Sequence, residues 1–93
     1  MRYEWDETKR RQNLAKHGLD FLDAVPVLEH PALLVIADTR HDYGEERLIG
    51  FGPLDGRLCV VVHVERSRGR IRIVSFRKAT RQELRFYEQH VQG

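Results

Sequence analysis

The sequence predicts one α+β domain, in which two N-terminal helices and one C-terminal helix flank a four-stranded antiparallel meander. Three observations support this class. The chain has 93 residues, which is the length of a single domain. Apolar residues recur at helical spacing near both ends, whereas short apolar runs between turn residues occupy the middle. Helices and strands that are segregated along the chain in this way are typical of α+β folds.

The N-terminal segment predicts a short strand followed by a helix. Residues 3–5 could form an edge strand. The helix is expected over residues 7–16, because Asp6 can cap its first turn and Gly18 can end it in the left-handed conformation. Leu14 is expected to face the core from this helix.

A second helix is expected over residues 21–29, with Asp20 as its cap. Four apolar side chains would share one face at three- and four-residue spacing: Phe21, Ala24, Val25 and Leu28. Pro26 falls inside this segment, and proline kinks or shortens a helix, so it limits the length that we expect.

Four strands are expected, at residues 33–37, 46–52, 58–64 and 70–78. The third is apolar on both faces, as a strand in the centre of a sheet would be. Residues 53–56 predict a hairpin turn between the second and third strands, because a proline followed by Asp-Gly suits a tight turn. Residues 38–45 are polar and predict a loop, and residues 67–69 predict a second turn.

The last strand contains two conflicting alternations. Ile71 and Ile73 share one parity, whereas Val74 and Phe76 share the other. Either both faces are partly buried, or a β-bulge near Val74 shifts the alternation by one residue. A bulge would direct four residues to one face and build a cationic platform there: Arg70, Arg72, Ser75 and Arg77.

The C-terminal helix is expected to begin with a capping box. In this motif the Thr80 hydroxyl accepts from the amide of Glu83, and the Glu83 carboxylate accepts from the amide of Thr80. Leu84, Tyr87 and Val91 follow near one face of the helix.

Charge is strongly segregated along the chain, although the formal net charge is only +2. Residues 66–81 contain seven lysines or arginines and no acid, whereas residues 20–46 contain seven acids and a single base, Arg40. Like charges on neighbouring strand positions repel each other, so the arrangement suggests a partner that is rich in phosphate.

Several classes of protein are disfavoured by composition. Cys59 is the one cysteine, which excludes an intrachain disulfide and a cysteine-rich zinc site. The N-terminus lacks the apolar segment of a signal peptide, and no apolar run approaches the roughly 18 residues that a membrane helix needs. We therefore expect a cytoplasmic protein without membrane contact.

A set of motifs resembles the BrnT toxins and covers nearly the whole chain in the expected order. The motifs are Tyr3-Glu-Trp-Asp6, Asn13-x-x-Lys-His-Gly18 with Phe21, Asp38-x-x-His41-x-x-Gly-Glu-Glu-Arg47, and Ile71-Arg-Ile-Val-Ser-x-Arg-Lys-Ala-Thr80 with Glu83 and Tyr87. Each motif is weak alone, but the set is fairly specific.

The resemblance implies the toxin of a type II toxin–antitoxin module with a RelE-like ribonuclease fold. It also implies an endoribonuclease that arrests translation. The implied partner is a BrnA-like antitoxin with a ribbon-helix-helix part. Through that antitoxin the complex would bind operator DNA, as a hetero-oligomer built on the antitoxin dimer.

Metal-independent RNA cleavage needs a base for the 2′-hydroxyl, a cation for the charge on phosphorus and an acid for the leaving oxygen. Arginine suits the cation because its planar fork binds two phosphate oxygens. The predicted catalytic residues are Arg72, Arg77, His41, Arg47 and Ser75. Further cations and one histidine are predicted to contact RNA: Lys16, His17, Arg70, Lys78 and Arg81.

Each of these residues also has a structural interpretation. The strand arginines could be solvated charges that protect an edge, and Ser75 a polar residue at the margin of the core. Lys16 and His17 could complement the dipole of the first helix. His41 could shape its loop with Asp38. His63 lies in a central strand and is expected to be a buried core histidine. Trp5 is expected to pack in the core or at an edge, and stacking on a base is the alternative.

One cluster in the sequence resembles a metal site. Asp38, His41 and Asp42 resemble metal ligands, but calcium loops need more oxygens and zinc sites need other spacing, so we expect no metal and no cofactor.

The alternative function is a non-catalytic nucleic-acid- or protein-binding module that acts as a co-repressor subunit. A helix-turn-helix with a basic recognition helix is lacking, which disfavours direct reading of duplex DNA.

Overall fold

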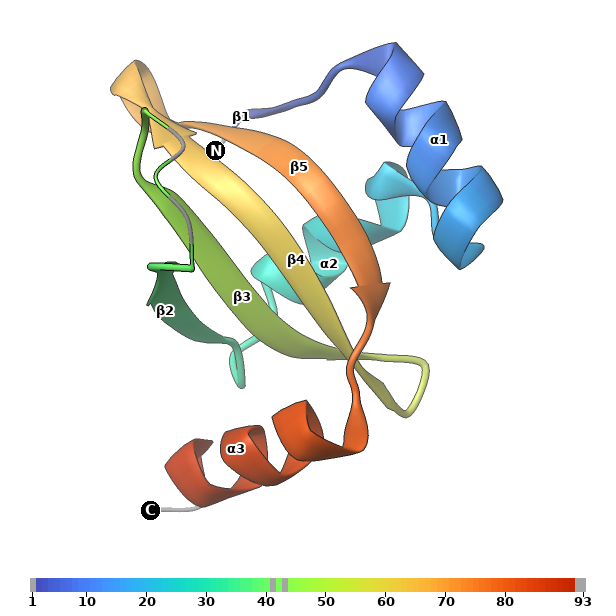
Figure 1. Cartoon of the computed structure of the whole chain (residues 1–93), viewed down its shortest axis with the longest axis vertical. Coiled ribbons are helices and arrows are strands. Elements are labelled where there is room, and N and C mark those ends of the chain that lie inside the picture. The colour runs from blue at the N-terminus through green and yellow to red at the C-terminus, as the bar shows by residue number, and fades with distance from the viewer. Residues whose placement is uncertain (1, 41, 43, 92–93) are drawn as a thin grey trace.

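The computed structural model describes residues 2–40, 42 and 44–91. In this part of the chain five strands form one mixed sheet in the order β1-β5-β4-β3-β2, with three α-helices around it (Figure 1). The elements are β1 (Arg2–Glu4), α1 (Glu7–His17), α2 (Ala24–Leu28), β2 (Leu34–Asp38), β3 (Arg47–Leu54), β4 (Arg57–Arg66), β5 (Arg70–Lys78) and α3 (Arg81–Val91). The predicted α+β class is confirmed.

The sheet differs from the prediction in one strand. β2 to β5 form the expected antiparallel meander, but β1 adds a fifth strand that runs parallel to β5, with Tyr3 opposite Ile71. The four-stranded antiparallel sheet is therefore corrected to a five-stranded mixed one. A three-residue strand is too short for its pattern to show its partner or its direction. β1 pairs with backbone groups that β5 would otherwise expose at its outer edge.

The predicted second helix is also corrected. The segment begins with a 3₁₀ turn at Phe21–Asp23, and only Ala24–Leu28 is α-helical. Asp20 caps the 3₁₀ turn by accepting a hydrogen bond from the amide of Leu22 at 3.1 Å. Pro26 lies in the first turn of α2, where its missing amide breaks no hydrogen bond within the helix.

The first helix has the predicted bounds to within a residue, but its buried side chain is different. Asp6 accepts from the amides of Thr8 and Lys9 at 2.8 and 3.1 Å, and Gly18 ends the helix with φ 71°. Leu14, expected in the core, is 40% exposed, whereas Asn13 is 7% exposed.

Asn13 binds the backbone of β5 as a neighbouring strand would. Its amide nitrogen donates to the carbonyl of Phe76 at 2.7 Å, and its amide oxygen accepts from the amide of Phe76 at 3.0 Å. α1 lies beside β5, past the end of the short strand β1 (Figure 1). A polar side chain is required here because buried backbone groups need hydrogen-bond partners.

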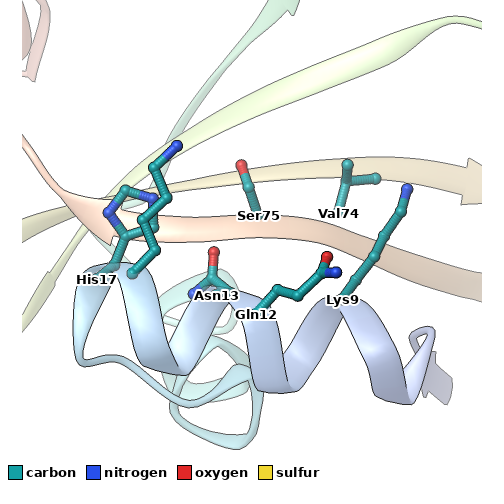
Figure 2. Close-up of a pocket in the computed structure, with 7 residues that line it drawn as sticks. Lys9, Gln12, Asn13, His17, Val74 and Ser75 are labelled. Carbon is teal, nitrogen blue, oxygen red and sulfur yellow. The ribbon is translucent and has the colours of Figure 1, made fainter.

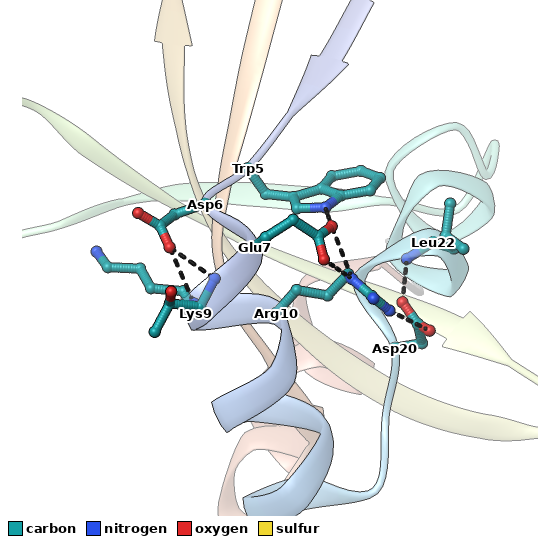
Figure 3. A network of polar contacts seen from close by, with 8 residues as sticks. Trp5, Asp6, Glu7, Lys9, Arg10, Asp20 and Leu22 are labelled. Atoms are coloured by element: carbon teal, nitrogen blue, oxygen red, sulfur yellow. Dashed lines mark hydrogen bonds and ion pairs between the residues drawn. The ribbon is translucent and has the colours of Figure 1, made fainter.

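A polar network holds the start of α1 to the segment that follows it (Figure 3). Arg10 forms ion pairs with Glu7 at 2.9 Å and with Asp20 at 3.0 Å. Trp5 donates from Nε1 to Glu7 at 3.0 Å and packs edge-on against Phe21, with ring centroids 6.2 Å apart. The packing role predicted for Trp5 is confirmed.

The bulge and two turns are found where they were predicted, with one correction. Asp55 and Gly56 join β3 to β4 with φ values of 51° and 76°, as a two-residue hairpin turn requires, but Pro53 pairs with Leu58 inside β3 and does not belong to the turn. Ser67–Gly69 forms a 3₁₀ turn between β4 and β5. Val62 pairs with Ser75 while His63 pairs with Ile73, so Val74 is the extra residue of a β-bulge.

Each face of the sheet buries its own cluster. On one face Phe21, Ala24 and Val27 pack against β4 and β5. Gly52 permits this approach, because a Cβ atom there would lie 2.9 Å from Cγ1 of Val27. His63 is buried on this side as predicted, and burial lowers the pKa of its imidazole.

The opposite face is covered in part by α3. Phe86 and Tyr87 of this helix pack on a cluster formed by Ile49, Phe51, Val60 and Val62. The rings of Phe51 and Phe86 have centroids 5.6 Å apart, and the Tyr87 hydroxyl donates to the carbonyl of Ala32 at 2.7 Å.

Candidate functional site

The bulge sorts the side chains of β5 between the two faces. Arg72, Ser75 and Arg77 lie opposite Val64, Val62 and Val60 of β4 respectively. Residues opposite one another in an antiparallel pair share a face, so these three lie on the face that α3 partly covers. Arg70 alternates with them through Arg72. We call Arg70, Arg72 and Arg77 the arginine face.

Each arginine of this face has a carboxylate partner. Arg70 and Arg72 share Glu4 of β1, at 3.2 and 3.3 Å, and Arg77 binds Glu83 of α3 at 2.7 and 2.8 Å. Residues 66–81 contain no acid, but in the folded chain acids lie beside these arginines. β1 and α3 bring the acids from both ends of the sequence.

Arg47 and Asp38 lie near the end of the sheet where Arg70 and Arg72 lie, and each of them has a charged partner of its own. Arg47 lies 3.6 Å from Glu45, which is 3.5 Å from Arg66 as well. Asp38 is buried and accepts from Arg40 at 2.8 and 2.9 Å. His41 lies outside the described residues, so its predicted role stays a prediction.

Glu83 serves two structures at once. It accepts from the amide of Thr80 at 2.8 Å, and Thr80 Oγ1 accepts from the amide of Glu83 at 3.1 Å, which confirms the capping box. The same carboxylate binds Arg77. The hydrogen bonds from Arg77 are the main reason that the pKa of Glu83 falls to about 2, and Glu83 in turn raises the pKa of Arg77.

A groove of about 260 Å³ lies between α1 and β5 (Figure 2). Side chains from α1 and from the bulge of β5 point into it, and we call it the α1–β5 groove. Its lining residues are Lys9, Gln12, Asn13, Lys16, His17, Val74 and Ser75. None of these is acidic, and Lys9 and Lys16 make no ion pair with another described residue.

His17 is the titratable group of this groove with a perturbed pKa. Burial lowers the pKa of its imidazole, and the positive charges of Lys16 and Arg77 lower it further. The ring is therefore biased toward the neutral form, which can accept a proton. Ser75 lines the groove and shares its face of β5 with Arg77 two positions later, so the groove adjoins one end of the arginine face.

The structure brings some of the predicted residues together and separates others. Lys16, His17 and Ser75 line one groove, with Arg77 near by. Arg70 and Arg72 lie at the β1 end of β5, and Lys78 and Arg81 lie beside the β3–β4 hairpin.

Four lining residues were not among the predicted site residues: Lys9, Gln12, Asn13 and Val74. For the three on α1 the signal was present in the sequence, because residues 9, 12, 13 and 16 lie on one side of a helix by their three- and four-residue spacing.

Two further observations concern the described residues as a set. None of their helices is both long and apolar enough to cross a membrane. No group of three or more His, Cys, Asp or Glu side chains among them is placed to hold a metal ion.

The fold and the groove define a small α+β domain with a basic groove beside its last strand. Residues 5–83 match the family described as the ribonuclease toxin BrnT of type II toxin–antitoxin systems. The chain belongs to this family.

A solved relative has the same fold. The crystal structure of the Brucella abortus ribonuclease toxin BrnT is 32% identical, with a TM-score of 0.68 over 87% of this chain and 99% of that one. A search of curated proteins found no match. The mixed sheet is the sheet of the BrnT fold, and the predicted RelE-like description differs from it in detail.

Proposed function

We propose that this protein is a metal-independent endoribonuclease that cleaves RNA in the α1–β5 groove and thereby arrests translation. The observation that carries this proposal is the groove itself. It gathers a histidine, two lysines and a serine hydroxyl, and no described acid lines it. An RNA backbone is the ligand that such a charge pattern favours.

The chemistry of RNA cleavage can be assigned to these groups. Neutral His17 accepts the proton of the ribose 2′-hydroxyl, and the resulting oxygen attacks the adjacent phosphorus. Lys9 and Lys16 hold the phosphate, and Ser75 donates a hydrogen bond to a phosphate oxygen. The P–O5′ bond then breaks, which leaves a 2′,3′-cyclic phosphate and a protonated 5′-hydroxyl. His41 stays the predicted acid for this last proton.

Arg77 is the arginine that we assign to the charge on phosphorus. Glu83 holds its guanidinium in a bidentate pair, which orients the group and keeps it charged. Arg72 and Arg47 stay predicted catalytic residues. None of the three lines the groove, but Arg77 follows the lining residue Ser75 by two positions on the same face of β5, and its charge lowers the pKa of His17. Arg72 and Arg47 therefore rank behind it.

The proposed partner is a BrnA-like antitoxin with a ribbon-helix-helix part, which suppresses the toxin and carries the complex to operator DNA. Family membership supports an antitoxin of some kind. The ribbon-helix-helix part and the assembly on an antitoxin dimer are our proposal.

The test is cleavage of a labelled RNA in EDTA by the wild type, by His17→Ala and by His90→Ala. We expect His17→Ala to lose about 100-fold or more in rate, as removal of a general base does. His90 is exposed on α3, away from the groove, so His90→Ala should retain the wild-type rate. Both variants must first show the thermal stability of the wild type.

Other outcomes would change the proposal. Full activity of His17→Ala would remove this residue from the mechanism. Salt-dependent RNA binding by the wild type without cleavage, also in a translating extract, would favour the non-catalytic module.

A further inference from the structure

A second depression lies away from the α1–β5 groove, between α3 and the β3–β4 hairpin. These two elements lie at the same end of the molecule (Figure 1). Two adjoining hollows of about 320 and 310 Å³ share Gly56, Arg57, Leu58 and Leu84, and we call them together the α3–hairpin groove.

The floor of this groove is aliphatic. Leu84 and Val91 are 41% and 40% exposed, and they lie two helical turns apart on α3, with Tyr87 between them. α3 turns Phe86 toward the sheet, so Leu84 and Val91 form a second apolar stripe that the described chain leaves uncovered. Leu58 and Pro53 continue this surface on the hairpin.

The rim of the groove is basic. Arg57, Lys78 and Arg81 border it and make no ion pair with another described residue, whereas Glu88 is the one acid among its lining residues. A partner that supplies acidic side chains at the margin and apolar ones at the centre would complement both features.

The nature of the floor favours a polypeptide over RNA. Single-stranded nucleic acids bind by stacking their bases on aromatic rings. The exposed floor is aliphatic, and its one aromatic residue, Tyr87, has its hydroxyl bound to Ala32. An amphipathic helix laid in a groove uses aliphatic contacts at three- and four-residue spacing.

We propose that the α3–hairpin groove binds an amphipathic segment of the antitoxin, with an apolar stripe against Leu84 and Val91 and acidic side chains near Arg57 and Arg81. This inference rests on the proposed function, because it takes the antitoxin as the partner. It locates that partner on a surface distinct from the RNA groove.

The test measures binding of a purified BrnA-like antitoxin to the wild type, to Leu84→Glu and to Leu14→Glu. Leu14 is the matched control, because it is a helical leucine with 40% exposure that does not line the groove. We expect Leu84→Glu to bind about 30-fold more weakly or worse, the loss typical of a central interface residue. Leu14→Glu should bind as the wild type does.

A second variant is needed because Leu84→Glu could weaken binding by disturbing the fold of α3. Arg57→Glu changes one exposed rim residue only, and it should lower antitoxin affinity most at low salt. In the wild type, amide exchange in α3 should slow when the antitoxin binds. Wild-type affinity of both variants, or equal losses in Leu84→Glu and Leu14→Glu, would overturn the proposal.

RNA cleavage by the isolated proteins separates this inference from the proposed function. If the variants cleave RNA normally and bind the antitoxin weakly, both proposals are supported. If the wild type cleaves RNA but binds antitoxin elsewhere, only the groove assignment fails. If the groove variants lose RNA binding but keep antitoxin binding, the groove is an RNA surface. If they lose only a toxin dimer, as seen by sedimentation, the groove binds a second copy of the chain. Either result would overturn the proposal.

Discussion

The α1–β5 groove and the arginine face adjoin each other, and both are basic, but their charges are in different states. In the groove, Lys9 and Lys16 project from a helix with no acid among the lining residues. On the arginine face, Glu4 and Glu83 bind every arginine. A run of basic residues in a sequence thus locates cations along the chain, whereas the topology decides which of them are paired with an acid.

The largest expected effect comes from Asn13→Ala, which removes the side chain that fixes α1 to β5. The amide and carbonyl of Phe76 would lose their partners in a buried place, at a cost of about 2–4 kcal/mol in the free energy of unfolding. Urea denaturation measures this loss, and Gln12→Ala, an exposed change in the same groove, should stay within about 0.5 kcal/mol of the wild type. RNA affinity should also fall, because α1 would no longer be fixed beside β5 to form the groove. The arginine face should stay intact.

The Arg77–Glu83 pair predicts how stability depends on pH. The pKa of Glu83 is lowered from 4.5 to about 2 in the folded protein. Its contribution is therefore complete above pH 4.5 and is lost as the pH falls toward about 2. Because the pair is partly exposed, we expect about 2 kcal/mol or less.

Urea unfolding at several pH values, with the wild type and Glu83→Gln, tests this prediction. The variant should be less stable at neutral pH and should lack most of the acid-dependent loss. An identical acid dependence in the two proteins would contradict the assignment.

The next effect contrasts the two regions directly through RNA binding. Lys9→Ala/Lys16→Ala should weaken binding about tenfold and reduce the steepness of its salt dependence by about 1.4 in log–log slope, since each lost phosphate contact removes about 0.7. Arg70→Ala/Arg72→Ala should change the slope less, because Glu4 already offsets part of that charge. Filter binding from low to high salt measures both. A larger change in the arginine variant would reverse the comparison.

The smallest expected effect sharpens the same contrast. Glu4→Gln should cost less than about 1 kcal/mol of stability, because the ion pairs that it breaks are partly exposed. It should also raise RNA affinity a few-fold, since Arg70 and Arg72 become available to phosphate. Unchanged affinity in the same filter assay would show that these arginines do not reach RNA.

Features that depend on neighbouring residues were predictable from the sequence. Asp6, Gly18 and Thr80 act on amide or carbonyl groups within a few positions, and the Asp55-Gly56 turn sets its own backbone angles. The bulge was predictable too, because the change in alternation at Val74 leaves a signature in one strand.

Features that depend on distant residues were not predictable. Nothing near Asn13 indicates that its partner is Phe76, 63 positions away, and this contact is what turns Leu14 outward. Glu4 likewise meets Arg70 and Arg72, which are 66 and 68 positions away, only after the strands are ordered. The sequence therefore predicted the residue types of the candidate site. It did not predict which residues share one groove or which cations are paired with acids.

The contact between Asn13 and Phe76 has a consequence for association between copies of the chain. β1 and Asn13 between them occupy the outer side of β5. The outer strands of the described sheet are then β1, which has three residues, and β2, which has five, so β2 offers the longer edge to which another strand can add. Edge-to-edge contact between two copies would join β2 to β2 and consume that longer edge in both. Such an assembly would close as a pair and would not grow into a fibre.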